Sequence, residues 1–162
     1  MKLFGILKHI TIRSFWSLLK LGLRYPLFAY PTFKATKTCL SVSTQYFGRA
    51  HYQNTPANAF RHAFWNYLIA MKCTKWSKNI SSILTWTKAI TDWHEDAFRN
   101  RELARLMDLH NNAIGRSIFL NNHHKTIEEA TSLLLNMTDT SVLIEHKDEL
   151  HENALNLVHI SN

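Results

Sequence analysis

Apolar residues recur at helical spacing along most of the chain. Between residues 79 and 98 they fall every three or four positions, at Ile83, Trp86, Ile90, Trp93 and Ala97. This is the period of one helix face, and it also predicts helices from 56 to about 73, from 101 to about 120 and from 126 to about 136. Four Gly and three Pro are too few for the many turns of a β-sandwich or barrel. The pattern therefore predicts an all-α protein, a single compact bundle of five or six helices.

Local signals mark where two of these helices begin. Thr55 is a suitable N-cap, and Pro56 occupies the first helical position, where its missing N–H costs nothing. Thr126 with Glu129 forms a capping-box pattern for the fourth helix. The tail, residues 140–162, is ambiguous and fits a helix followed by a short terminal strand.

Residues 1–24 have the pattern of a basic amphipathic helix. Its cations share one stripe, and Leu, Ile and Phe cover the other side. Such a helix suits a membrane interface, with its apolar side in the acyl boundary and its cations toward anionic headgroups. It could equally dock on its own domain, and the sequence does not favour one alternative over the other.

Pro26 and Pro31 predict an irregular loop over residues 24–38, because proline interrupts a regular helix. The basic helix and this loop together make up a first segment, 1–38. The remainder, 39–162, is expected to be the helical domain, with the motifs described below forming its core at 55–120.

The N-terminal segment is a poor membrane span and a poor secretory signal. Lys20 and Arg24 interrupt its apolar run, and no small-residue cleavage site follows the basic start. We expect a cytoplasmic protein, or one that is peripheral on the inner membrane. Cys39 and Cys73 have no zinc-binding spacing and are expected to be free thiols.

The charge is divided between the two halves of the chain. Residues 1–91 hold 13 Lys or Arg and no acid, whereas residues 92–162 hold 6 Lys or Arg and all 12 acids; +13 and −6 give the net +7. A basic, acid-free half predicts attraction to a polyanion: an anionic membrane surface, a nucleic acid, or the acidic half of the same fold. Nucleic acid is the least favoured, because the chain has no recognised nucleic-acid motif.

Two polar clusters interrupt the apolar pattern in the first half of the predicted core. Asn58, His62 and Asn66 are spaced i, i+4, i+8 and so share one helix face. His94 and Glu95 follow near the end of the next helix, where they could supply a general base and a metal ligand. They do not form an HExxH motif, and adjacent residues point about 100° apart. A buried polar seam and a solvated helix end are the structural alternatives.

A third polar cluster lies between residues 107 and 116. Asp108, Asn111, Asn112 and Gly115 are expected on one helix face. Glycine within a helix costs about 1 kcal/mol relative to alanine, which is tolerable where another backbone or a ligand must come close. Arg116 then offers a planar fork for a carboxylate or phosphate.

The three clusters in this order resemble an uncharacterised bacterial domain family. Its motifs correspond here to "NAFRHAFWN" (58–66), "HE" (94–95) and "MDLHNNAIGR" (107–116), and the resemblance covers roughly residues 55–120. Such domains occur alone or at the C-terminus of long polymorphic-toxin-like proteins. The resemblance implies a site rather than an activity. It marks Asn58, Arg61, His62, Trp65, Asn66, His94, Glu95, Asp108, His110, Asn111, Asn112 and Gly115.

"FRHAFWNYL" is also similar to the catalytic helix of phospholipases A2. In those enzymes His is followed by a calcium-binding Asp, and a second Asp orients the His. Here Ala63 follows His62, and the glycine-rich calcium loop is missing as well. The similarity is therefore an analogy, in which Glu95 or Asp108 would be the partner acid.

We expect a hydrolase that acts on a phospholipid or another ester at a membrane surface. His62 would be the general base, oriented by Glu95 or Asp108; alternatively, His94 and Asp108 would hold a divalent metal such as zinc or manganese. The expected catalytic residues are His62, His94, Glu95 and Asp108. The expected substrate-binding residues are Asn58, Arg61, Asn66, His110, Asn111, Asn112 and Arg116.

The alternative is a non-catalytic helical module that binds a membrane or a protein partner. Its polar cluster would be a hydrogen-bond network that fixes the register of the helices. The hydrolase hypothesis requires the three motifs to face a shared hollow, whereas a sealed and fully bonded cluster would rule out the proposed chemistry.

Overall fold

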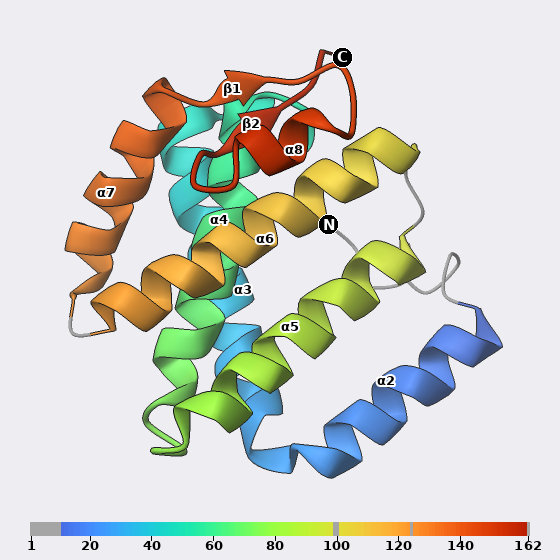
Figure 1. Cartoon of the computed structure of the whole chain (residues 1–162). Helices are drawn as coiled ribbons and strands as arrows, with labels where there is room; N and C mark the ends of the chain where they lie inside the picture. Colours follow the sequence, from blue (N-terminus) through green and yellow to red (C-terminus); the bar gives the residue numbers. More distant parts are fainter. Residues whose placement is uncertain (1–10, 99–100, 124, 162) are drawn as a thin grey trace.

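The computed structural model describes residues 11–98, 101–123 and 125–161 (Figure 1). Helices dominate these residues, and an all-α fold is confirmed. The α-helices are α2 (Ile12–Arg24), α3 (Ala29–Phe47), α4 (Pro56–Cys73), α5 (Ile80–Ala97), α6 (Glu102–Asn122), α7 (Ile127–Asp139) and α8 (Glu149–Glu152). Two 3₁₀ turns, η1 (Pro26–Phe28) and η2 (Ala50–Tyr52), flank α3.

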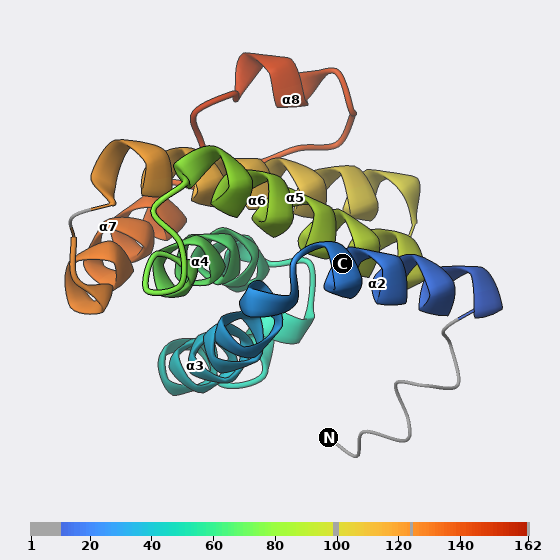
Figure 2. The same ribbon diagram turned by 90° about the horizontal axis from the view of Figure 1, so that it is seen from below.

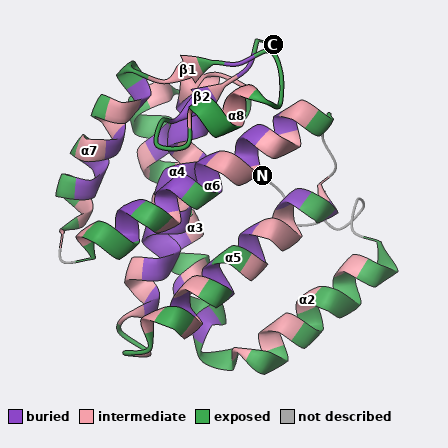
Figure 3. Cartoon of the chain, in the orientation of Figure 1, coloured by how far each residue is buried: buried purple, intermediate pink, exposed green. Residues whose placement is uncertain are grey.

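Helix α4 is the centre of the bundle. Figure 2 shows it between α3 on one side and the α5–α6 pair on the other, and it also contacts α7. Most of its residues are buried (Figure 3). Its aromatic and aliphatic side chains fill the main core, where Phe60, Phe64, Tyr67, Leu68 and Ile69 are fully buried. Burial on this scale makes α4 the helix on which the others pack.

Helices α4 and α6 approach each other closely at Gly115. A Cβ atom at this position would lie 2.0 Å from the backbone oxygen of Ala63. Only a residue without a side chain fits there, so the close approach expected from a glycine inside a helix is confirmed. The partner at this point is the backbone of α4.

The C-terminal tail forms a small parallel sheet beside α6. Strand β1 (Val142–Leu143) pairs with β2 (Val158–His159), and Val142 lies opposite Val158. A second apolar cluster joins this sheet to α6 through Ala104, Met107, Ile144, Val158 and Ile160. The helix and short strand expected in the tail are therefore present, together with one further strand.

Most helix boundaries agree with the sequence. The capping box at Thr126 and Glu129 is formed in both directions. Thr55 is the N-cap of α4 and Pro56 its first residue, but the Thr55 hydroxyl donates to the Ala50 carbonyl at 2.9 Å instead of capping the helix.

The loop predicted for residues 24–38 is wrong. Pro26 begins η1, and Pro31 lies in the first turn of α3. The N–H groups of a first turn have no partner within the helix, so a proline costs little there. Helix α3 runs through the boundary predicted between residues 38 and 39. With α3 and α8, the described residues form seven α-helices rather than five or six.

Helix α2 docks on the bundle by one side only. It contacts α5, and the Trp93 indole donates to the Ser14 carbonyl at 2.9 Å, yet no residue of α2 is buried. Residues 1–10 of the expected amphipathic helix lie outside the described residues. Among the residues that the structure describes, no helix combines the length and apolarity needed to cross a bilayer. Cys39 and Cys73 are free and buried, as expected.

Candidate functional site

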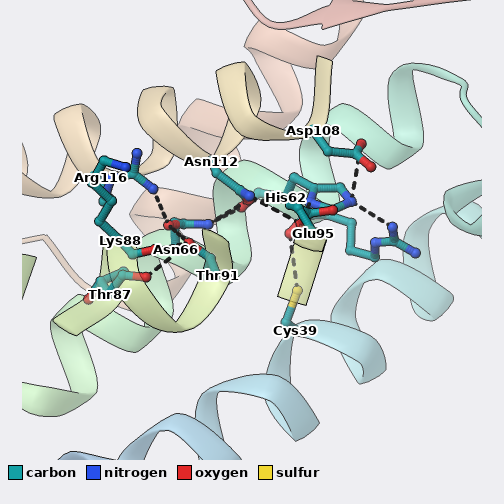
Figure 4. Close-up of polar contacts among 11 residues, drawn as sticks. Cys39, His62, Asn66, Thr87, Lys88, Thr91, Glu95, Asp108, Asn112 and Arg116 are labelled. Atoms are coloured by element: carbon teal, nitrogen blue, oxygen red, sulfur yellow. Dashed lines mark hydrogen bonds and ion pairs between the residues drawn. The ribbon is translucent and has the colours of Figure 1, made fainter. Parts of the chain in front are cut away.

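Three helices each contribute a stripe of polar residues with a spacing of four. Residues at this spacing share one helix face, and the three stripes meet in the interior between α4, α5 and α6 (Figure 4). All but one of the nine side chains belong to buried residues, Arg116 being half-buried. The stripes are Asn58, His62 and Asn66 on α4, Thr87, Thr91 and Glu95 on α5, and Asp108, Asn112 and Arg116 on α6.

His62 lies at the centre of this cluster. Its Nδ1 is 3.2 Å from Asn112 Oδ1 and 3.5 Å from Glu95 Oε1. Its Nε2 is 2.7 Å from Arg61 Nη2 and 3.3 Å from Asp108 Oδ1. An arginine can only donate, so Nε2 accepts and Nδ1 carries the proton. His62 is therefore a neutral imidazole whose proton faces Asn112 and Glu95.

Burial and neighbouring positive charge keep His62 neutral. Burial lowers its pKa well below 6.5, and the charges of Arg61 and His94 lower it further. Burial, and after it the charge of Arg61, also lowers the pKa of His94 to about 4. Neither imidazole carries a proton on both nitrogens at neutral pH.

The two carboxyl groups are shifted in the opposite direction. Burial raises the pKa of Glu95 to about 8, and the nearby Asp108 carboxyl adds to the shift. Burial also raises the pKa of Asp108 to about 7. Among the described residues, Asp108 Oδ1 is a buried atom without a hydrogen-bond partner, although it lies at ion-pair distance from His62. For both acids, burial outweighs the stabilisation of the ionised form by Arg61 and, for Glu95, by the Asn112 amide and Arg105.

Hydrogen bonds between amide side chains fix the orientation of the centre. Asn112 Nδ2 donates to Glu95 Oε1 at 3.3 Å, and Asn112 Oδ1 accepts from Asn66 Nδ2 at 2.6 Å. Asn66 Oδ1 in turn accepts from Arg116 Nη1 at 2.8 Å and lies 3.2 Å from the Thr91 hydroxyl. Each amide thus has one consistent orientation, and Arg116 is linked to the centre through two asparagines.

The cluster has the composition and size of a metal-binding site. His62, Glu95 and Asp108 each offer a nitrogen or oxygen ligand atom, and these atoms lie within 4.8 Å of one another. A divalent cation among them would add positive charge and would favour ionised carboxylates. The geometry therefore suits a cation held by one imidazole and two carboxylates.

A comparison with known protein families identifies the domain. Residues 19–142 match a domain of unknown function, DUF6973. The chain belongs to the DUF6973 family. The matched residues span positions 58–66, 94–95 and 107–116, and they also cover α3, α7 and part of α2. No curated protein and no solved structure matches the chain.

Most of the predicted site residues of this DUF6973 domain lie in or beside the cluster. Arg61 is half-buried next to His62. His94 is outside the bonded centre and packs against the rings of Trp65 and Phe98, at centroid distances of 5.2 and 4.8 Å. Asn58 is buried one turn before His62, and its side-chain oxygen has no hydrogen-bond partner among the described residues.

The structure does not bring His110 and Asn111 to the cluster, which corrects their expected place at the site. His110 Nε2 donates to the Asn156 carbonyl at 2.9 Å. Asn111 accepts from the Val158 N–H at 3.0 Å and donates to the Val158 carbonyl at 2.8 Å. Both residues hold the C-terminal segment against α6, so their positions are explained by the fold.

Two residues of the stripe on α5 were not among the predicted site residues. Thr87 and Thr91 precede Glu95 by eight and four residues, and both are fully buried. Thr91 joins the cluster through Asn66. The same four-residue spacing that places Asn58, His62 and Asn66 on one helix face would have identified Thr87 and Thr91 on α5.

Proposed function

We propose that this DUF6973 domain is a hydrolase with a divalent metal ion held by His62, Glu95 and Asp108. The observation that carries the proposal is the convergence of these three side chains, from three helices, on one buried point. An imidazole and two carboxylates form a ligand set that suits zinc or manganese. A metal bound by three protein ligands keeps a coordination position for water or substrate, and it makes that water more acidic.

Arg61 would bind the anionic part of the substrate. Its guanidinium now lies against His62 Nε2, a position that a cation could share only if Arg61 turned away. Arg61 is half-buried and carries a long side chain, so this movement needs no change in the helix. A guanidinium beside the metal suits a phosphoester or a carboxyl ester with a nearby negative group. Asn112, Asn66 and Arg116 would hold His62 and Glu95 in place.

The first test is metal binding by the purified full chain after treatment with a chelator. Calorimetric titration with zinc and with manganese should show one site per chain. Asp108→Asn removes one charged ligand and should weaken binding at least about tenfold, since loss of even supporting groups has effects of this size. Asp96→Asn is the matched control, because Asp96 is an exposed carboxylate on α5 that pairs with Arg105. Wild-type protein that binds neither metal would overturn the proposal.

The second test is catalysis. The metal-loaded protein is assayed with chromogenic phosphodiesters, carboxyl esters and phospholipid vesicles, and compared with His62→Ala and with the metal-free protein. The proposal requires turnover that depends on both the metal and His62. His110→Ala is the control, because His110 lies away from the cluster on the same helix as Asp108.

A second candidate function is a non-catalytic helical module. The observation that favours it is burial: His62, Glu95 and Asp108 are 3%, 5% and 5% exposed, and hydrogen bonds link the stripes. A network of this kind fixes the register of packed helices. It predicts a protein that neither binds metal at the cluster nor hydrolyses any of these substrates, and that loses stability when one member is removed.

A further inference from the structure

The outward side of α2 exposes large apolar side chains. Phe15, Leu19 and Leu23 are 52%, 41% and 72% exposed. They are spaced four residues apart and therefore share one face of the helix. Single exposed apolar residues are common on proteins, whereas a contiguous group marks a surface that binds something.

Helix α3 extends this group across a groove. A groove of about 480 Å³ lies between α2 and α3, with α5 at its base, and Phe15, Leu19 and Leu23 line it together with Phe33 of α3. Phe33 is 60% exposed. These four residues are called the α2–α3 apolar face below. Further exposed apolar residues occur on the same two helices and the turn between them, namely Ile12, Trp16, Leu27 and Tyr30.

The charged residues on these two helices are all cations. Lys20 and Arg24 are exposed on α2, and Lys34 and Lys37 are exposed on α3. The Lys37 ammonium lies 5.8 Å from the centre of the Phe33 ring. No Asp or Glu occurs in residues 1–91. An apolar face flanked by lysines allows the rings to enter an apolar phase while the ammonium groups remain in the polar layer.

We propose that the α2–α3 apolar face docks the protein on an anionic lipid bilayer. Apolar side chains would enter the acyl boundary, and the flanking cations would contact anionic headgroups. A second copy of the chain would place cations against cations, which is unfavourable. A nucleic acid would use the cations but would leave the aliphatic side chains in water. This proposal does not depend on the metal site, so it stands or fails separately.

Vesicle binding by the full chain tests the proposal. Sedimentation with phosphatidylcholine vesicles is compared with sedimentation with mixed phosphatidylcholine–phosphatidylglycerol vesicles at low and physiological salt. Binding is expected only to the anionic vesicles and should weaken as salt screens the charges. The double variant Leu19→Ser/Phe33→Ser should bind at least about tenfold more weakly, because each substitution removes apolar surface from the bilayer. Leu155→Ser is the matched control, because Leu155 is 81% exposed in the C-terminal segment.

Three results would overturn the proposal. The first is equal binding to neutral and anionic vesicles, which would mean that the cations play no part. The second is a dimer that depends on Leu19 and Phe33 in a protein without affinity for vesicles. The third is a protein that binds single-stranded RNA or duplex DNA and has no affinity for vesicles. In that case the double variant Lys34→Glu/Lys37→Glu would lose nucleic-acid binding, whereas Leu19→Ser/Phe33→Ser would keep it. Thermal melts confirm that each variant is folded before binding is measured.

Discussion

At the scale of single residues, burial explains the protonation states of the cluster. Without a cation, the low-energy state of His62, Glu95 and Asp108 at pH below 7 is a neutral imidazole beside protonated carboxyl groups. Burial penalises every charged form. A positive ion in place of the water that these groups lost on folding would favour ionised Glu95 and Asp108, with His62 remaining a neutral ligand.

Replacement of Glu95 by glutamine should make the metal-free protein more stable at high pH. The pKa of Glu95 is raised from 4.5 to about 8 in the folded state. The folded protein therefore binds more protons than the unfolded one between these values, and its stability falls as pH rises through this range. A glutamine side chain keeps an oxygen for the Asn112 amide but cannot ionise. The free energy of unfolding of Glu95→Gln should exceed that of wild type by a margin that grows between pH 5 and pH 8. The margin should reach about 2 kcal/mol or more, since one pKa unit corresponds to about 1.4 kcal/mol.

Urea unfolding at several pH values in the presence of a chelator measures this difference. Asp96→Asn is again the control, because Asp96 is exposed in the folded state and so is solvated both before and after unfolding. A Glu95→Gln variant whose relative stability is the same at pH 5 and pH 8 would show that burial does not disfavour the Glu95 carboxylate.

Replacement of Asn112 by alanine should destabilise the protein by about 3 kcal/mol. Asn112 bonds to Asn66, His62 and Glu95, and its loss removes one hydrogen bond from each of these buried groups, where a lost hydrogen bond costs about 1–3 kcal/mol. Asn121→Ala is the matched control, because Asn121 is exposed on the same helix. Chemical unfolding compares the two variants. A loss for Asn112→Ala no larger than that of the control would mean that the amide does not organise the cluster.

At the scale of elements, the crossing of α4 and α6 depends on the absence of a side chain at Gly115. A methyl group there would lie 2.0 Å from the Ala63 carbonyl oxygen, which is rigid backbone. Gly115→Ala should therefore cost at least about 2 kcal/mol, although alanine is the better helix former by about 1 kcal/mol. Gly22→Ala is the control, because a methyl group on Gly22 of α2 meets nothing within 4 Å. Thermal or chemical unfolding should show Gly115→Ala to be destabilised and Gly22→Ala to be neutral or slightly more stable.

The helices that the sequence predicts well are those with both an apolar stripe and a start signal. Helices α4 and α7 begin at the expected residues, because Pro56 and the Thr126–Glu129 pair act locally. The sequence does not predict α3, because a proline such as Pro31 ordinarily indicates a break in a helix. The effect of a proline depends on where the helix begins, and the chain before α3 offers no polar cap to mark that position.

The convergence of the site was predictable, but the composition of each helix face was only partly so. Asp108 and Asn112 are four residues apart and face the cluster, whereas His110 is about 200° away from Asp108 around the helix and faces the C-terminal segment. Strict use of helical spacing would have separated His110 from the site. Which helices pack together depends on tertiary contacts, and no pattern within a single helix gives that information.

At the scale of the whole molecule, the cluster joins the three helices α4, α5 and α6. Because His62, Glu95 and Asp108 lie on separate helices, a cation bound by all three would stabilise the bundle as a unit rather than a single helix. Any ligand that binds only the folded state raises the free energy of unfolding by mass action. If a cation binds at the cluster, the thermal stability of the protein should therefore rise with the concentration of that cation.

The stabilisation that a metal confers should increase with pH. Ligation requires ionised carboxylates, whereas the metal-free protein holds protons on Asp108 up to about pH 7 and on Glu95 up to about pH 8, the pKa values that burial gives them. Metal binding must displace these protons, so affinity should rise by up to about tenfold per pH unit for each proton displaced and should level off above about pH 8. The rise in Tm on addition of manganese should therefore be larger at pH 8 than at pH 6. Calorimetry in two buffers of different ionisation enthalpy counts the protons released, and Asp108→Asn should release fewer than wild type. A metal-induced rise in Tm that is equal at both pH values, with no proton release, would place the bound metal away from Glu95 and Asp108.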